Sequence, residues 1–281
     1  MIKFSHTIFA LPFAMVGFFL GVNRPGGSFS WQELGLVLLC MVFARSAAMA
    51  FNRWLDRDID AANPRTIQRE IPAGVISPRA ALWFVIINCL LFVACTYFLN
   101  PLVLALSPIA LLVILGYSYT KRFTALCHLV LGLGLALAPI GAYLATGGSF
   151  DLIPILYSVA VLTWVSGFDI IYALQDREFD ESQHLHSIPV ALGRVRAMRL
   201  SEGLHVVSGL SILAAGYFLA AEYPEVLWLH WAGALIFIGL LIYQHLIVSP
   251  TDLRRVNLAF FTTNGVASVV FGCLVILDFF I

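Results

Sequence analysis

Oxygen-bearing side chains recur at every fourth position of the stretch NRWLDRDID, which runs from Asn52 to Asp60. On a helix, Asn52, Asp56 and Asp60 would share one face over two turns. Two carboxylates at this spacing repel each other unless a cation lies between them. Mg²⁺ prefers oxygen ligands, and it binds one or two protein carboxylates together with substrate phosphates and water. The spacing therefore predicts half of a site for Mg²⁺ and a phosphate-bearing substrate. A solvated, salt-bridged surface is the alternative interpretation.

The same four-residue step returns at Asp176 and Asp180, which follow Asp56 and Asp60 at an equal interval along the chain. Each pair ends an apolar run and precedes a polar loop, and this indicates an internal parallel repeat. Two facing acidic helix ends would hold several Mg²⁺ ions around one diphosphate and neutralise the charge that develops on it as a leaving group. Departure of a diphosphate from carbon generates a carbocation.

Ionisable and aromatic groups lie deeper on the same helix faces. Asp169 precedes Asp176 by nearly two turns, and an ionisable side chain at membrane depth is by default functional. Arg45 has the matching position before Asn52. We expect it to contact a substrate carboxylate, Asp169 or a neighbouring carbonyl, with structural pairing inside the bundle as the alternative. Tyr172 lies on the same helix face as the acidic residues. There it would stabilise an allyl cation through its ring or donate a hydrogen bond from its hydroxyl, and packing against neighbouring helices is the alternative.

The elements that position these residues are apolar. Only 11% of the 281 residues are charged, and runs of about 20 apolar residues, long enough to cross the hydrocarbon core of a bilayer, recur along nearly the whole chain. We therefore predict an all-α polytopic membrane protein, with a single integral-membrane domain over residues 1–281 and nine transmembrane helices. The predicted spans are 5–22, 33–56, 79–98, 101–118, 124–146, 152–175, 199–220, 225–248 and 256–280.

Basic residues indicate the orientation, because Lys and Arg in short loops favour the cytoplasmic side. A cytoplasmic N-terminus places every loop Lys and Arg inside except Arg24. The long polar segments 57–78 and 176–198 then face the cytoplasm, whereas the outward connections are short and nearly uncharged. Function is therefore expected at the cytoplasmic face.

Cysteine and histidine give weaker signals. The five cysteines lie inside predicted spans without a CxxC or Cys/His spacing, so we interpret them as apolar packing residues. The seven histidines are scattered, and His184 with His186 is interpreted as loop rather than as a ligand pair. Asp58, Glu178 and Glu181 point away from the acidic helix faces and are expected to be solvated.

These residues resemble the motifs of the UbiA superfamily of intramembrane prenyltransferases, which read approximately N-D-x-x-D-x-x-x-D and D-x-x-Y-A-x-Q-D-x-x-x-D. The second motif occurs as DIIYALQDREFD, Asp169 to Asp180, complete at every fixed position. The first occurs as NRWLDRDID, with Arg53 where many members have Asp, which removes one potential metal ligand. YSYTKRFT, from Tyr117 to Thr124, and SHTIFALPFA, from Ser5 to Ala14, also resemble family segments.

The resemblance implies nine transmembrane helices around a central cavity, capped by the two cytoplasmic polar loops and located in the bacterial inner membrane. The string MAFNRWLDRDIDAANPRT followed by REIPAG looks most like the bacterial menaquinone branch that prenylates 1,4-dihydroxy-6-naphthoate in the futalosine pathway. Proteins of that branch are easily taken for 4-hydroxybenzoate polyprenyltransferases, because both acceptors are hydroxylated aromatic acids.

Spacing and resemblance together assign roles. The expected Mg²⁺ ligands are Asn52, Asp56, Asp60, Asp176 and Asp180. The residues expected on the diphosphate oxygens are Arg65, Arg69, Lys121 and Arg122, where Arg offers two-pronged geometry and Lys a point charge. The candidate catalytic residues are Asp169, Tyr172 and Arg45.

The predicted reaction is the Mg²⁺-dependent transfer of a polyprenyl group from a polyprenyl diphosphate to a hydroxylated aromatic acid in respiratory quinone biosynthesis. The acceptor is 1,4-dihydroxy-6-naphthoate for menaquinone or 4-hydroxybenzoate for ubiquinone. The prenyl tail is expected in an apolar groove open to the lipid bilayer, and no nucleic-acid partner is expected. A polytopic transporter with a cytoplasmic-side metal or anion site is the alternative, since intramembrane charges and parallel repeats also occur in transporters. The polar clusters lie at one face rather than near the midplane, and this favours the enzyme.

Overall fold

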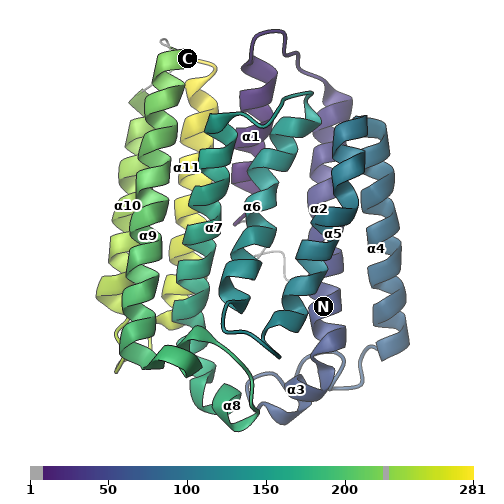
Figure 1. Ribbon diagram of the computed structural model, residues 1–281, viewed down its shortest axis with the longest axis vertical. Coiled ribbons are helices and arrows are strands. Elements are labelled where there is room, and N and C mark those ends of the chain that lie inside the picture. Colours follow the sequence, from purple (N-terminus) through teal and green to yellow (C-terminus); the bar gives the residue numbers. More distant parts are fainter. Residues whose placement is uncertain (1–8, 224–227) are drawn as a thin grey trace.

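The structure, a computed structural model, describes residues 9–223 and 228–281, and the regular elements in these ranges are helices apart from one isolated β-bridge. The elements are α1 (Leu11–Asn23), α2 (Trp31–Leu55), α3 (Arg57–Ala62), α4 (Pro78–Leu99), α5 (Pro101–Thr120), α6 (Cys127–Ala145), α7 (Leu152–Ala173), the 3₁₀ turn η2 (Leu174–Asp176), α8 (Arg177–Ser182), α9 (Ile188–Glu222), α10 (Trp228–Ile247), the π-helix η3 (Leu258–Thr263) and α11 (Asn264–Asp278). The long helices run side by side along the long axis of the molecule (Figure 1).

Eight helices in the described residues are long and apolar enough to cross a membrane, so the prediction of an all-α polytopic membrane protein is confirmed. The first predicted span, 5–22, lies partly outside the described residues. Its described part is α1, an apolar helix of 13 residues, which is shorter than the other spans.

Local sequence signals start several of these helices. The α4 segment begins at Pro78, and the Ser77 hydroxyl accepts a hydrogen bond from the backbone N–H of Ala80 at 3.2 Å. The α5 segment begins in the same way, with Asn100 as the cap and Pro101 as the first helical residue. A capping side chain satisfies a free N–H of the first turn, and proline is tolerated there because its missing N–H would have no partner.

Helix α7 lies at the centre of the bundle, packed against α6 and α9. Its Trp164 is fully buried, and the indole contacts the rings of Phe13 and Phe237 at centroid distances of 5.5 and 5.4 Å. On the other side, Gly132 of α6 lies so close to α7 that a Cβ atom there would be 2.4 Å from the carbonyl oxygen of Leu162. Helices in lipid associate through such close packing rather than through the hydrophobic effect.

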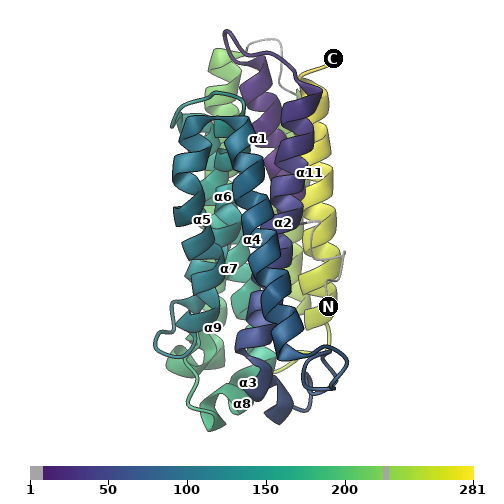
Figure 2. The same cartoon turned by 90° about the vertical axis from the view of Figure 1, so that its right-hand side faces the viewer.

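The outer surface and one end of the bundle differ in polarity. Large apolar side chains such as Leu112, Leu235 and Leu246 are more than two-thirds exposed, as expected where helices face lipid. Figures 1 and 2 show α3 and α8 at the same end of the bundle, opposite to the C-terminus. The two polar segments that carry the acidic motifs therefore meet at one end.

The two polar segments expected to be loops contain helices. Segment 57–78 contains α3, and segment 176–198 contains α8 and the beginning of α9. Ser187 caps α9, and Gly193, with φ of 75°, interrupts its first turns. Charged residues in 194–199 conceal this start, since hydropathy detects only the part of a helix that faces lipid.

Candidate active site

Each acidic motif lies at a break between a long helix and a short one. Asp56 ends α2 and precedes α3 with φ of −92° and ψ of 8°, and Asp176 precedes α8 with φ of −97° and ψ of 2°. This sparsely populated backbone region is common among active-site residues. The predicted spans 33–56 and 152–175 end near these two breaks, which interrupt the helical face expected through each motif. The N–H of Asp60 still donates to the carbonyl of Asp56 at 2.7 Å, so the four-residue register is retained in the first motif.

Asp56 is buried and surrounded by hydrogen-bond donors, of which Lys121 and Arg122 come from another part of the chain. Its Oδ2 atom lies 2.6 Å from Lys121 Nζ and accepts a hydrogen bond from Asn52 Nδ2 at 2.9 Å. Its Oδ1 atom lies 2.9 Å from a guanidinium nitrogen of Arg122. Only 2% of the Asp56 side chain is exposed, so these cations compensate a buried charge.

Asp60 lies one turn further on and is also buried. Arg69 donates to its Oδ1 atom at 2.7 Å, and the Thr66 hydroxyl donates to its backbone carbonyl at 3.1 Å. The second carboxylate oxygen, Oδ2, is buried without a hydrogen-bond partner among the described residues. A buried carboxylate oxygen in this state is costly, and a bound cation would satisfy it.

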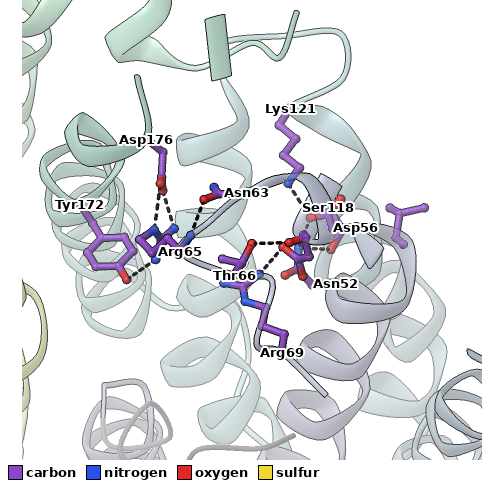
Figure 3. A network of polar contacts seen from close by, with 12 residues as sticks. Asn52, Asp56, Asn63, Arg65, Thr66, Arg69, Ser118, Lys121, Tyr172 and Asp176 are labelled. Atoms are coloured by element: carbon purple, nitrogen blue, oxygen red, sulfur yellow. Dashed lines mark hydrogen bonds and ion pairs between the residues drawn. The ribbon is translucent and has the colours of Figure 1, made fainter. Parts of the chain in front are cut away.

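Arg65 connects the first polar segment to the second motif (Figure 3). Its Nε and Nη2 atoms donate to the two oxygens of Asp176 at 2.9 and 2.5 Å, and its Nη1 donates to the Tyr172 hydroxyl at 2.9 Å. The guanidinium also lies 5.3 Å from the centre of the Tyr172 ring. Partial burial lowers the pKa of the Arg65 guanidinium, but the bonds and charge of Asp176 outweigh it and raise the pKa above its ordinary value.

Asp169 lies deeper and contacts a histidine that the sequence did not single out. Its Oδ2 atom is 2.7 Å from Nδ1 of His128, at the beginning of α6. The scattered histidines gave no reason to separate His128 from the others. The one available signal was its position shortly after the family-like segment that contains Lys121.

These residues surround one cavity of about 270 Å³. It is lined by Asn52, Asp56, Asp60, Arg65, Arg69, Lys121, Asp169, Tyr172, Asp176 and Asp180 among the predicted residues, and by Asn63, Thr66, Tyr117, Ser118, Cys127, His128, His186 and Ser187 among others. Almost every site residue predicted from the sequence is therefore brought to one place, although the two motifs are far apart along the chain.

Two predicted site residues, Arg45 and Arg122, are not in the cavity lining. Arg122 lies behind the lining, where it donates to the carbonyls of Ser118 and Leu55 at 3.0 and 3.1 Å. Nε of Arg45 is buried with no hydrogen-bond partner among the described residues. Its ionisable neighbour is Tyr117, which does line the cavity.

Other charged residues of the motifs lie outside the cavity. The side chains of Asp58, Glu178 and Glu181 are 86%, 66% and 62% exposed, as their positions on the helix predicted. Arg53, which replaces the Asp of many family members, is absent from the lining as well.

The donor set fits Mg²⁺, because carboxylate and amide oxygens from Asn52, Asp56, Asp60, Asp176 and Asp180 all line the cavity and Asp60 has an unpartnered oxygen. Within residues 9–223 and 228–281, however, no three His, Cys, Asp or Glu side chains converge as a ready metal site. The carboxylates are instead held by cations: Asp56 by Lys121 and Arg122, Asp60 by Arg69, and Asp176 by Arg65. The cavity thus contains anions and cations in pairs, a composition suited to a ligand that has both.

Comparison with known proteins agrees with this arrangement. The model of the UbiA prenyltransferase family matches residues 10–266. The 4-hydroxybenzoate octaprenyltransferase of Aeromonas salmonicida is 31% identical over 242 residues, which cover 86% of this chain and 82% of the relative. The apo structure of a UbiA homolog from Aeropyrum pernix has a TM-score of 0.86 and 32% identity, covering 99% of this chain and all of that one. A UbiA homolog from Archaeoglobus fulgidus bound to GPP and Mg²⁺ shares the fold, with a TM-score of 0.75 and 22% identity over 98% of this chain and 96% of that one.

Proposed function

The chain belongs to the UbiA prenyltransferase family and is a prenyltransferase, and from this premise we propose that it transfers a polyprenyl group from a polyprenyl diphosphate to a hydroxylated aromatic acid. The observation that carries the proposal is the single cavity in which acidic residues of both motifs lie among Arg65, Arg69 and Lys121. The resemblance to the UbiA superfamily is confirmed at the level of the family, and the transporter alternative is set aside by the family match.

Mg²⁺ would be held by Asn52, Asp56, Asp60, Asp176 and Asp180. When bound, it neutralises charge on the departing diphosphate and so makes it a better leaving group. The Mg²⁺-bound homolog of the same fold and the oxygen-only donor set support this proposal.

The basic residues are proposed to bind the diphosphate oxygens. Arg65, Arg69 and Lys121 each form an ion pair with a motif carboxylate. A diphosphate would offer its oxygens to these basic residues, and its metal would offer a cation to the carboxylates. Binding would therefore replace each ion pair by contacts with the substrate and would leave no buried charge uncompensated. Arg122, behind the lining, would keep Asp56 in position.

Ionisation of the prenyl diphosphate leaves an allyl cation that needs stabilisation without attack by water. Tyr172 is suited to this, because its ring faces the cavity and is supported from behind by Phe260 at a centroid distance of 4.1 Å. The electron-rich carbon of the acceptor ring then attacks the cation. Asp169 is proposed to orient the ring. Arg45 lies outside the cavity lining beside Tyr117, so the alternative expected from the sequence, a structural role inside the bundle, is proposed for it.

The proposed setting is the bacterial inner membrane, with the N-terminus and both motifs at the cytoplasmic side and residues 1–281 forming one domain. Loop charge supports this orientation, because Arg24 is the one loop cation expected outside. Respiratory quinone synthesis is the proposed role, with 1,4-dihydroxy-6-naphthoate or 4-hydroxybenzoate as the acceptor. The names of the curated relatives support the benzoate, and the REIPAG segment supports the naphthoate.

Prenyl transfer by the purified protein in detergent tests the proposal. The assay contains Mg²⁺, a polyprenyl diphosphate and either acceptor, and it compares Asp56→Ala and Asp176→Ala with the matched control Asp58→Ala, whose side chain is 86% exposed. We expect product from one acceptor, loss of product in the two cavity variants, and normal activity in the control. Binding of the diphosphate without product from either acid would contradict the acceptor class, and absence of diphosphate binding would contradict the whole proposal.

A further inference from the structure

We propose that His128, oriented by Asp169, accepts the proton that the aromatic ring loses after prenylation. This inference rests on the proposed function and adds a catalytic residue that lies outside both aspartate-rich motifs. The chemical requirement is a base within the cavity, close to the acceptor ring and away from the diphosphate.

The geometry fixes which nitrogen carries hydrogen. Nδ1 of His128 lies 2.7 Å from Oδ2 of Asp169, and an ionised carboxylate only accepts hydrogen bonds, so Nδ1 carries the hydrogen. In the neutral imidazole, Nε2 then has a free lone pair. A carboxylate that holds histidine in this tautomer also stabilises the imidazolium formed when Nε2 takes a proton.

Nε2 itself is available. It is buried, and no hydrogen-bond partner reaches it from the described parts of the chain. Buried polar atoms are nearly always paired, so an unpaired one on a cavity-lining residue indicates a partner in the loaded state. Only 4% of the His128 side chain is exposed, against 22% for Asp169, which keeps bulk water away from the base.

The pair is deep enough for the acceptor ring. Asp169 lies in α7, seven positions before Asp176 at the end of η2. At helical spacing this is a rise of about 10 Å, so Asp169 lies below the level at which Arg65 and Asp176 would hold the diphosphate. Titratable groups from other elements also line the cavity around the pair: Asp180 of α8, Tyr117 of α5 and Cys127 of α6.

The two helices that carry the pair are held in register. The Ser166 hydroxyl of α7 lies 2.7 Å from the carbonyl of Leu162 on its own helix and 3.1 Å from the backbone carbonyl of His128, so its one hydrogen is shared between the two helices. One turn along α6, Gly132 allows the close helix approach, since a Cβ there would lie 2.3 Å from Ser166 Oγ. The imidazole is therefore positioned by its backbone as well as by Asp169.

The proposed step balances as follows. The prenyl C–O bond breaks, its electron pair leaves with the diphosphate, and a ring carbon of the acceptor forms the new C–C bond. That carbon now bears both hydrogen and the prenyl group. Nε2 of His128 takes the hydrogen as a proton, the C–H electron pair restores the aromatic ring, and Asp169 remains ionised beside the imidazolium. Release of the proton to water with the diphosphate returns the enzyme to its starting state.

The test uses His128→Asn, because the Asn amide replaces Nδ1 as a donor to Asp169 but has nothing in place of Nε2. The matched control is His184→Asn, in an exposed turn outside the cavity at a positive φ of 52° that Asn tolerates. Turnover is measured with the acceptor carrying hydrogen or deuterium at the attacked ring carbon. Affinity for the polyprenyl diphosphate and the melting temperature are measured on the same samples.

We expect His128→Asn to keep its melting temperature and diphosphate affinity while kcat falls by about 10²- to 10⁴-fold, the usual contribution of a positioned base. Proton loss should become rate-limiting, so that a deuterium isotope effect appears in the variant and is larger than in the wild type. Unchanged kcat, or a lower kcat without an increased isotope effect, would overturn the assignment. A wild-type protein that binds diphosphate but prenylates neither acid would instead refute the proposed function, and the base with it.

Discussion

Arg65 donates two parallel hydrogen bonds to Asp176, at 2.9 and 2.5 Å, and thereby joins the polar segment after the first motif to the second motif. The same guanidinium reaches the Tyr172 hydroxyl. Arg65, which is proposed to bind the diphosphate, thus holds in place both Asp176, a proposed metal ligand, and Tyr172, which is proposed to stabilise the allyl cation.

Replacement of Arg65 by Lys should weaken substrate binding. Lysine keeps the charge but cannot donate to both oxygens of Asp176 and to Tyr172 together. Loss of such charged hydrogen bonds is worth about 1.5–3 kcal/mol, or roughly a 10- to 100-fold increase in KM for the polyprenyl diphosphate. Steady-state kinetics would show it, with Arg57→Lys, which lies on the outer side and contacts Asp58, as the control. Equal KM values in the two variants would contradict this role for Arg65.

Asp60→Asn should raise the Mg²⁺ concentration needed for half-maximal activity. The change removes the charge from the carboxylate whose Oδ2 is unpartnered and leaves Arg69 without its anion. Loss of one charged contact predicts a shift of about 10-fold or more. Activity is titrated with Mg²⁺ after treatment with EDTA, which should abolish turnover in the wild type. A half-saturation unchanged from wild type would exclude Asp60 as a ligand.

Asp56 should matter more for stability than Asp176. The Asp56 side chain is 2% exposed between Lys121 and Arg122, whereas Asp176 is 18% exposed and pairs with an arginine that is 38% exposed. Breaking a buried pair costs about 3–5 kcal/mol, because the remaining charge is uncompensated. Thermal unfolding in detergent should therefore show a larger decrease for Asp56→Asn than for Asp176→Asn. The reverse order would mean that burial does not control the strength of these pairs.

Gly132→Ala should disturb the cavity from outside it. The new methyl group would lie 2.4 Å from the carbonyl oxygen of Leu162, which is backbone and has no freedom to rotate away. Overpacking of this kind costs about 1–3 kcal/mol and would separate His128 from Asp169. Gly141→Ala on the same helix is the control, since a Cβ there meets nothing within 4 Å. Melting temperature and kcat should both fall for Gly132→Ala alone, and equal behaviour of the two variants would contradict the close approach.

The sequence by itself determined the class of the protein, most of the helices and the identity of the acidic residues. Apolar runs of transmembrane length, prolines next to capping residues, and a four-residue acidic step are local properties, fixed by neighbours along the chain. The helices that hydropathy missed are α3, α8 and the first turns of α9, where charged side chains lie on a helix outside the lipid-facing zone.

Only the tertiary structure decided which groups meet. Hydropathy could not show that Lys121 neutralises Asp56, that His128 binds Asp169, or that Arg45 lies outside the cavity lining. Nor could it show the backbone breaks at Asp56 and Asp176, because the four-residue spacing is the same with or without them. The physical reason is that a helix face is set by local periodicity, whereas its partner across the bundle is chosen by close packing between helices far apart in sequence.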